Sequence, residues 1–112
     1  MPAGEQPTSM PFIAETRSPV EVISLASPGR LEVIDGCLTV AIQGSERATA
    51  VFPPGVKPEL RGNDVVAVSF EGRRFLIGEE TLIPGGGIRL SSAELVKPIP
   101  SYCPKVLFGL GG

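Results

Sequence analysis

Three consecutive glycines, Gly85 to Gly87, stand in the stretch GEETLIPGGGIRL. Glycine-rich loops hold phosphates where they open a helix, because free backbone N–H groups then point at the anion. Here apolar runs flank the glycines, and neither the Lys-Ser or Lys-Thr of a phosphate loop nor the spacing of a dinucleotide fingerprint is present. The sequence therefore predicts a chain turn, with Pro84-Gly85 as a type II centre and the other glycines allowing a bulge or the close approach of another backbone.

The two cysteines, Cys37 and Cys103, are the next candidates for chemistry. In a small chain, two cysteines far apart in sequence form either a disulfide or two buried thiols, and catalysis by one of them would need a free thiolate. A structural zinc site needs four ligands, and this chain has no His and no Cys-x-x-Cys pair. We therefore expect no metal site and no other cofactor.

Acid–base catalysis also lacks its usual groups. The chain has no His, which is the common general base near neutral pH. Asp35 and Asp64 belong to turn motifs, and Glu79 and Glu80 would point to opposite faces of a strand. The sequence therefore predicts that the protein is not an enzyme.

Composition and charge limit the partners. The net charge is −2 with scattered Lys and Arg, whereas nucleic-acid binders usually carry a basic face, so nucleic acid is an unlikely partner. No apolar run approaches the ~18 residues of a membrane span. No signal peptide is recognisable, so any signal or lipid anchor would have to precede Met1. The oligomeric state is not indicated.

The prolines divide the chain into two parts. Residues 1–19 contain four prolines and no periodicity, and predict a flexible arm in which only Phe12 and Ile13 would dock. Residues 20–112 predict one domain, since the chain is 42% hydrophobic and its apolar runs are separated by Gly/Pro turns. The last residues, GLGG, predict a flexible end after an apolar segment that lies on the domain.

Two hairpins are the clearest elements. Asp35-Gly36 suits a type I′ turn and predicts that Leu31, Val33, Leu38 and Val40 share the core face, with Cys37 off that face. A second hairpin turns at Glu71-Gly72 and sets Val68 opposite Phe75 and Ser69 opposite Arg74.

The remaining elements follow from turn residues. Strands are expected over 20–26 and 47–52, a turn at Ser27-Pro28-Gly29, and a loop over 56–64. The spacing of Ser91 and Glu94 predicts one short helical turn. Together these predict an all-β fold, a small five- to six-stranded antiparallel barrel of the OB type, with a sandwich as the alternative.

Three side chains are candidates for a binding face: Phe52, Tyr102 and Arg74. Phe52 belongs to FPPG, which suits either a proline-rich ligand or, more commonly, a strand that ends at a rigid turn. An aromatic side chain on the surface would suit a binding face, but aromatic residues in a small domain more often lie in the core.

The segments DGCL (35–38), VFPPG (51–55), IGEETLIPGGG (77–87) and IPSYCP (99–104) stand in an order that resembles a group of small bacterial proteins, many of them exported or lipid-anchored, without an assigned function. Glu79 and Phe52 depart from the Asp and Trp that are usual in the group. The resemblance implies a bacterial envelope setting and a Cys37–Cys103 disulfide; with reduced cysteines the protein would be cytoplasmic.

We therefore expect a non-enzymatic structural or interaction module of the envelope, with a protein or glycan partner. The alternative is an OB-like domain that binds oligosaccharide or, less readily, single-stranded nucleic acid. A thiol-dependent redox protein is the third hypothesis, and the absence of a Cys-x-x-Cys pair makes it the weakest.

Overall fold

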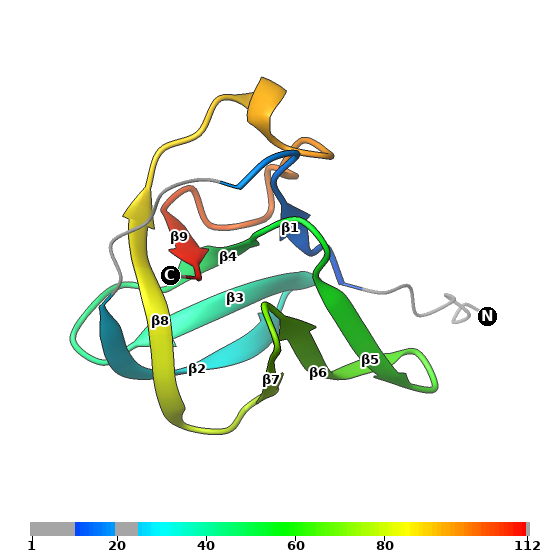
Figure 1. Cartoon of the computed structure of the whole chain (residues 1–112), viewed down its shortest axis with the longest axis vertical. Helices are drawn as coiled ribbons and strands as arrows, with labels where there is room; N and C mark the ends of the chain where they lie inside the picture. Colours follow the sequence, from blue (N-terminus) through cyan, green and yellow to red (C-terminus); the bar gives the residue numbers. More distant parts are fainter. Residues whose placement is uncertain (1–10, 20–24, 112) are drawn as a thin grey trace.

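The computed structural model describes residues 11–19 and 25–111 (Figure 1). Within these residues the chain is all-β, and its one helical element is a 3-10 turn, η2 (Ser92–Glu94). The strands are β1 (Ala14–Glu15), β2 (Ala26–Ile34), β3 (Cys37–Ile42), β4 (Ala48–Phe52), β5 (Lys57–Arg61), β6 (Asp64–Phe70), β7 (Arg73–Leu76), β8 (Thr81–Ile88) and β9 (Leu107–Leu110). The all-β class and the short helical turn are confirmed.

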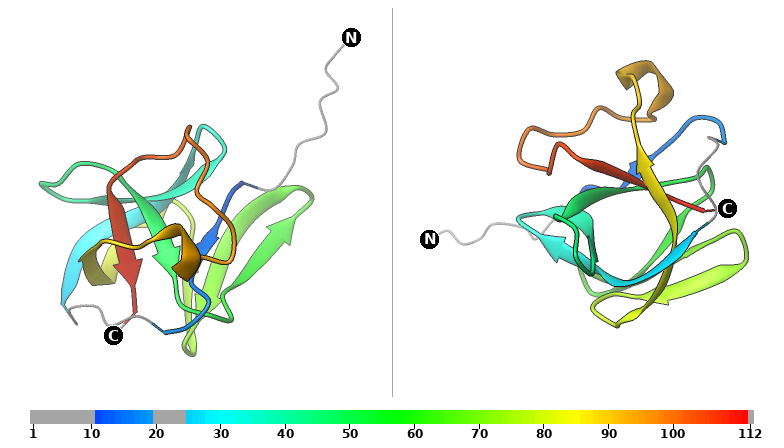
Figure 2. Two further views of the ribbon diagram at one scale, coloured as in Figure 1. Left: turned by 90° about the horizontal axis from the view of Figure 1, so that it is seen from above. Right: turned by 90° about the vertical axis from the view of Figure 1, so that its left-hand side faces the viewer.

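Five strands close into a ring in the order β4-β3-β2-β8-β9, and β9 pairs back onto β4 (Figure 2). β1 joins β4 as a sixth strand. The small barrel is thus confirmed, but the β4–β9 and β1–β4 pairings are parallel, whereas the sequence predicted antiparallel pairing. The other four pairings of the ring are antiparallel, so its two end strands, β4 and β9, run in the same direction and the pairing that closes five strands has to be parallel.

The β2–β3 hairpin has the predicted register. Leu31 pairs with Val40 and Ile34 with Cys37, and Asp35 and Gly36 take the positive φ of a type I′ turn, 52° and 78°. Val33 differs from the prediction, because it is 38% exposed rather than in the core. β8 pairs only with the first part of β2, so the end of the hairpin has no ring strand on that side.

The turn predicted at Ser27-Pro28-Gly29 is wrong, because β2 runs through it and pairs there with β8. A Cβ on Gly29 would lie 2.4 Å from the carbonyl oxygen of Ala41. Gly29 therefore permits β2 and β3 to approach closely, and such an approach is a common reason for glycine inside a strand. The strand expected over 20–26 falls largely on residues 20–24, which lie outside the described residues.

The turn predicted at Pro84–Gly87 is also wrong, because β8 continues through all four residues. β8 changes partner here: up to Pro84 it pairs with β2, and from Gly85 it pairs with β9. At Gly85 φ is +131°, and a Cβ would lie 1.9 Å from the carbonyl oxygen of Gly109. A close backbone approach therefore exists, but at Gly85, which the sequence placed in the turn, and not at Gly87, which was among the glycines expected to allow it; it lets one strand pair with two neighbours.

The remaining strands form a three-stranded sheet in the order β5-β6-β7. The second hairpin has the predicted register, with Val68 opposite Phe75. The loop expected over 56–64 is instead largely β5, which ends in a turn at Gly62. β5 tolerates Pro58 because it is a sheet-edge strand, where the missing N–H interrupts no ladder.

The main core joins the ring to the three-stranded sheet. Phe52 of β4 meets Phe70 of β6 edge-to-face with ring centroids 5.3 Å apart, and Phe70 stacks on Phe75 of β7 at 5.2 Å. The buried residues of this core come from both sheets: Leu31, Leu38, Val40, Ala48, Ala50, Phe52, Val65, Val68, Phe70, Phe75, Ile83 and Leu110. The aromatic contacts each add stabilisation beyond their buried area.

The predicted arm is shorter than expected, because its second half belongs to the barrel. The backbone N–H of Phe12 donates to Gly36 (2.8 Å), and Leu38 donates back to Phe12 (3.0 Å). Thr16 donates from its backbone to Phe52 (3.0 Å). β1 thus lies beside the start of β3 and the end of β4; residues 1–10 lie outside the described residues.

The predicted flexible C-terminal end is a strand instead. Leu110 in β9 is 3% exposed, and the N–H of Gly111 donates to the carbonyl of Pro84 (3.2 Å). Phe108 packs against the main core, as its apolar segment predicted. Gly109 and Leu110 are therefore built into the ring, and Gly111 is bonded to it; Gly112 lies outside the described residues.

One buried hydroxyl offers a test of this packing. Thr16 Oγ1 is buried and has no hydrogen-bond partner among residues 11–19 and 25–111, whereas the equally buried Thr39 Oγ1 donates to the carbonyl of Glu32 (2.9 Å). Thr16→Val should raise the free energy of unfolding by about 1 kcal/mol, since it removes an unpaired polar group. Thr39→Val, the matched control, should lower it by about 1 kcal/mol. Urea denaturation of both variants checks this, and equal losses would contradict it.

Candidate functional site

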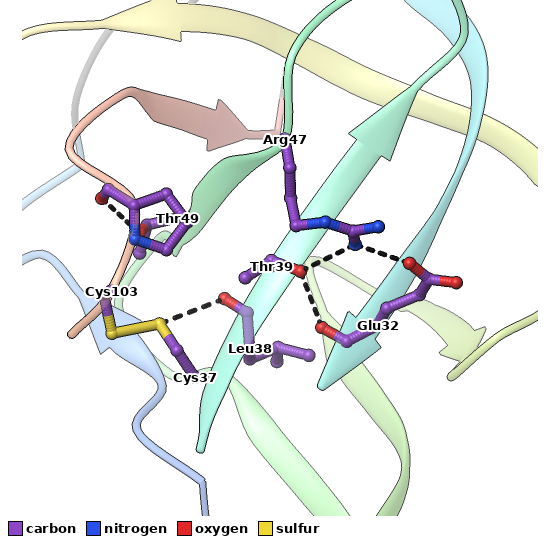
Figure 3. The surroundings of a disulfide bond; sticks show 8 residues. Glu32, Cys37, Leu38, Thr39, Arg47, Thr49 and Cys103 are labelled. Carbon is purple, nitrogen blue, oxygen red and sulfur yellow. Dashed lines mark hydrogen bonds and ion pairs between the residues drawn. A yellow bond between two sulfur atoms is a disulfide. The ribbon is translucent and has the colours of Figure 1, made fainter. Parts of the chain in front are cut away.

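Cys37 and Cys103 form a disulfide, with their Cα atoms 5.6 Å apart (Figure 3). Cys37 opens β3, and Cys103 lies in the connection before β9. Both are buried, at 0% and 5% exposure. Of the two states that the sequence left open, the cysteines are thus in the bonded one, and the pairing implied by the resemblance is confirmed.

The disulfide is part of a larger attachment of the connection to β4. Thr49 Oγ1 donates to the carbonyl of Pro104 (2.7 Å), and the carbonyl of Val106 accepts from the backbone N–H of Thr49 (2.8 Å). Figure 3 shows Thr49 and Cys103 on neighbouring segments. These contacts hold the chain immediately before β9, so they fix the strand that closes the ring.

A charged cluster lies on the same sheet near the disulfide. The carboxylate of Glu32 accepts hydrogen bonds from Arg30 and Arg47. Figure 3 shows Arg47 between this carboxylate and Thr39 Oγ1, to which it also donates (3.3 Å). The bond from Arg30, followed by that from Arg47, holds the pKa of Glu32 below its ordinary value of 4.5. Glu32 is thus a structural anion rather than a proton donor.

This cluster predicts a pH dependence. Because the pKa of Glu32 is lower in the folded than in the unfolded chain, its stabilisation is complete above pH 4.5 and is lost as the pH falls through the folded pKa. Glu32→Gln should therefore lower the free energy of unfolding by about 1 kcal/mol at pH 7 and have no effect at low pH. Glu80→Gln is the control, because Glu80 is 62% exposed and 3.8 Å from Arg30. Urea denaturation at several pH values measures both; a difference that persists at low pH would contradict the expectation.

The three predicted binding-face residues do not form one face. Phe52 is 0% exposed and belongs to the core. Arg74 lies on β7 and is bound by the carboxylate of Glu59 across the three-stranded sheet. Tyr102 alone is both aromatic and strongly exposed, at 59%, among the described residues. The prediction is therefore wrong for Phe52, which is not exposed, and binding by Tyr102 or Arg74 stays a prediction.

Tyr102 borders a groove of about 390 Å³ between the N-terminal segment and the connection that follows η2. We call it the Tyr102 groove, and its lining residues are Pro11, Phe12, Ile13, Glu15, Val96, Lys97 and Tyr102. The sequence analysis missed Glu15 and Lys97. They come together because the N–H of Val96 donates to the carbonyl of Glu15 (2.9 Å), a contact between segments about 80 residues apart in the chain.

Two larger hollows lie elsewhere in the described part of the chain. One, of about 530 Å³, is bordered by the exposed end of the β2–β3 hairpin. The other, of about 550 Å³, lies beside Gly85–Gly87 and reaches Leu25, where the described residues begin again. Neither contains an aromatic side chain that is as exposed as Tyr102.

Comparisons with protein-family models, with curated proteins and with solved structures found no match to this chain. Over residues 11–19 and 25–111, no helix is long and apolar enough to cross a membrane. In the same residues, His, Cys, Asp and Glu nowhere gather in a group of three or more that could hold a metal ion.

Proposed function

We propose that this protein is a non-catalytic interaction module of the bacterial envelope, which binds its partner at the Tyr102 groove. The observation that carries the proposal is the Cys37–Cys103 disulfide, since it fixes the exposed Tyr102 beside that groove. A large aromatic side chain on a rigid support gives contact area at low entropic cost.

The envelope setting rests on two arguments. Disulfides persist in oxidising compartments such as the bacterial periplasm and are rare in the cytosol. The order of the DGCL, VFPPG, glycine-rich and IPSYCP segments resembles exported bacterial proteins. Both arguments favour an exported location.

The non-catalytic role is supported by the state of the reactive groups. Both cysteines are bonded to each other, so neither is available as a thiolate. Hydrogen bonds from arginine lower the pKa of Glu32 and of Glu59, and such carboxylates stay ionised instead of transferring protons near neutral pH.

The OB-like alternative gains support from the order of the ring. Counted along the chain, the ring strands are β2 (first), β3 (second), β4 (third), β8 (fourth) and β9 (fifth). Around the ring they follow one another as first, second, third, fifth and fourth, and the third and fifth strands are parallel. OB barrels bind oligosaccharides and oligonucleotides beside the loop after their first strand and the loop before their last. Gly36 and Tyr102 lie in the corresponding turn and connection. This supports a ligand at the same groove.

A site-specific cross-linking experiment tests the proposal. A photoreactive amino acid replaces Tyr102 in the full chain, and Leu82, which is 59% exposed on β8, is the matched control position. We expect a discrete adduct from position 102 and none from position 82, in cells whose exported fraction contains the oxidised protein. Adducts at both positions or at neither, or a chain recovered only in the reduced form, would overturn it.

A further inference from the structure

We propose that the Tyr102 groove binds an uncharged sugar ring, which stacks on Tyr102 and bonds to Lys97 and Glu15. This inference rests on the proposed function and names its ligand class.

The aromatic ring is held in place before any ligand arrives. Tyr102 adjoins the bonded Cys103, whose N–H donates to the carbonyl of Pro100 (3.1 Å) and closes a turn around it. Its Cε1 lies 3.7 Å from the position that a Cβ of Gly36 would occupy, so one ring edge rests against the β2–β3 turn. The residue is nevertheless 59% exposed. A fixed, exposed tyrosine offers an apolar face with a polar tip, which suits the C–H face and the hydroxyl groups of a sugar.

The polar groups supply both kinds of hydrogen bond. Glu15 Oε2 accepts from the N–H of Gly55 (2.9 Å), which fixes the carboxylate and leaves Oε1 as an acceptor. Lys97 is exposed and has no ion-pair partner within the described residues, so its ammonium is a donor. The backbone bond from Val96 to Glu15 holds the two segments side by side, so that Glu15 and Lys97 both line the groove. The hydroxyl groups of a sugar ring both donate and accept hydrogen bonds, so they can bond to Lys97 and to Glu15 at the same time.

The groove also favours a sugar over other ring-shaped ligands. A volume of about 390 Å³ falls within the range of small-molecule sites, roughly 300–1,000 Å³. A nucleotide would stack on Tyr102 equally well, but its phosphate would meet the carboxylate of Glu15 with one lysine to offset it. A hydrophobic protein anchor would leave Lys97 and Glu15 unpaired at the contact. The neutral ring satisfies all three side chains.

The chain carries its own reporter for a test. Tyr102 is the single tyrosine and there is no tryptophan, so the intrinsic fluorescence reports this site alone. The full oxidised chain is titrated with triacetylchitotriose, with maltotriose and with hexathymidylate. We expect a saturable change with at least one trisaccharide, with a Kd on the order of 1 mM, and none with the nucleotide.

Four variants separate stacking from general effects, with binding followed by backbone amide NMR shifts. Tyr102→Phe should keep the Kd within about threefold, whereas Tyr102→Ala should raise it at least about tenfold, the loss expected for an aromatic stack. Lys97→Gln should raise it about threefold to tenfold. Leu82→Ala, at an exposed residue outside the groove, should leave it unchanged.

The inference is overturned if neither trisaccharide gives a saturable shift, if hexathymidylate alone binds, or if Leu82→Ala weakens binding as much as Tyr102→Ala. Its failure is distinguishable from failure of the proposed function. A protein adduct from position 102 together with no sugar binding would retain the interaction module and replace the sugar with a protein partner.

Discussion

Replacing both cysteines by alanine is expected to lower the free energy of unfolding by about 4 kcal/mol. The disulfide joins residues 66 positions apart, and removing it frees the unfolded chain to adopt many more conformations. It also leaves β9 without the covalent anchor that precedes it. Urea denaturation of Cys37→Ala/Cys103→Ala against the oxidised protein measures the loss.

Two further measurements test whether the loss comes from the disulfide and where in the fold it acts. The wild-type protein in a strong reductant should lose about as much stability as the double variant, because both lack the same bond. Hydrogen exchange in the double variant should accelerate more in β9 than in β6, since β6 lies in the middle of the separate three-stranded sheet. A loss below about 1 kcal/mol would show that the attachment of Thr49 to the connection suffices without the disulfide.

Gly85→Ala is expected to lower the free energy of unfolding by at least about 3 kcal/mol, because it strains the backbone and forces two strands apart. The new Cβ would lie 1.9 Å from the carbonyl oxygen of Gly109, and φ at this position is +131°. β8 and β9 would have to separate where the ring closes. Thermal and urea denaturation of the purified variant measure the loss.

Gly87→Ala is the matched control for this variant. Gly87 lies two residues further along β8, and its Cβ would come no closer than 4.0 Å to the nearest atom, the carbonyl oxygen of Leu107. We expect a change within about 1 kcal/mol there. Equal losses at the two positions would mean that the glycine run matters for its flexibility and not for the close approach.

The sequence predicted those elements whose structure depends on neighbouring residues. Asp35-Gly36 and Glu71-Gly72 each set the register of a hairpin, because a two-residue turn and the alternation of apolar residues specify the same pairing. The 3-10 turn was predicted from Ser91 and Glu94 for the same reason, and the Glu94 carboxylate does accept from the N–H of Ser91 (3.0 Å).

The predictions from the sequence were wrong where the place of a glycine or proline depends on a strand that is distant in the chain. Gly29 and Gly85 were interpreted as turn residues, but each lies in a strand where another backbone comes close. Pro58 was interpreted as a loop residue, but it lies on an edge strand. A local pattern does not distinguish these uses, because the partner strand is many residues away in the chain.

The candidate site was predicted in part for the same reason. The exposure of Tyr102 follows from its place among prolines in a turn, whereas the burial of Phe52 depends on contact with Phe70 of the other sheet. Glu15 was assigned to the arm, and only its contact with Val96 brings it near Lys97. Residues that are far apart in the chain and meet only in the folded protein form no motif of fixed spacing in the sequence.

The order in which the ring strands occur along the chain has a consequence for biosynthesis, because β9 follows all the others. β9 pairs with both β4 and β8, so the ring stays open until residues 107–110 have been made and released. During translation or export the growing chain therefore exposes the pairing edges of β4 and β8, which other chains are able to recognise. Synthesis that stops before residue 107 should yield a product with these edges open, prone to aggregation and suited to capture by a chaperone.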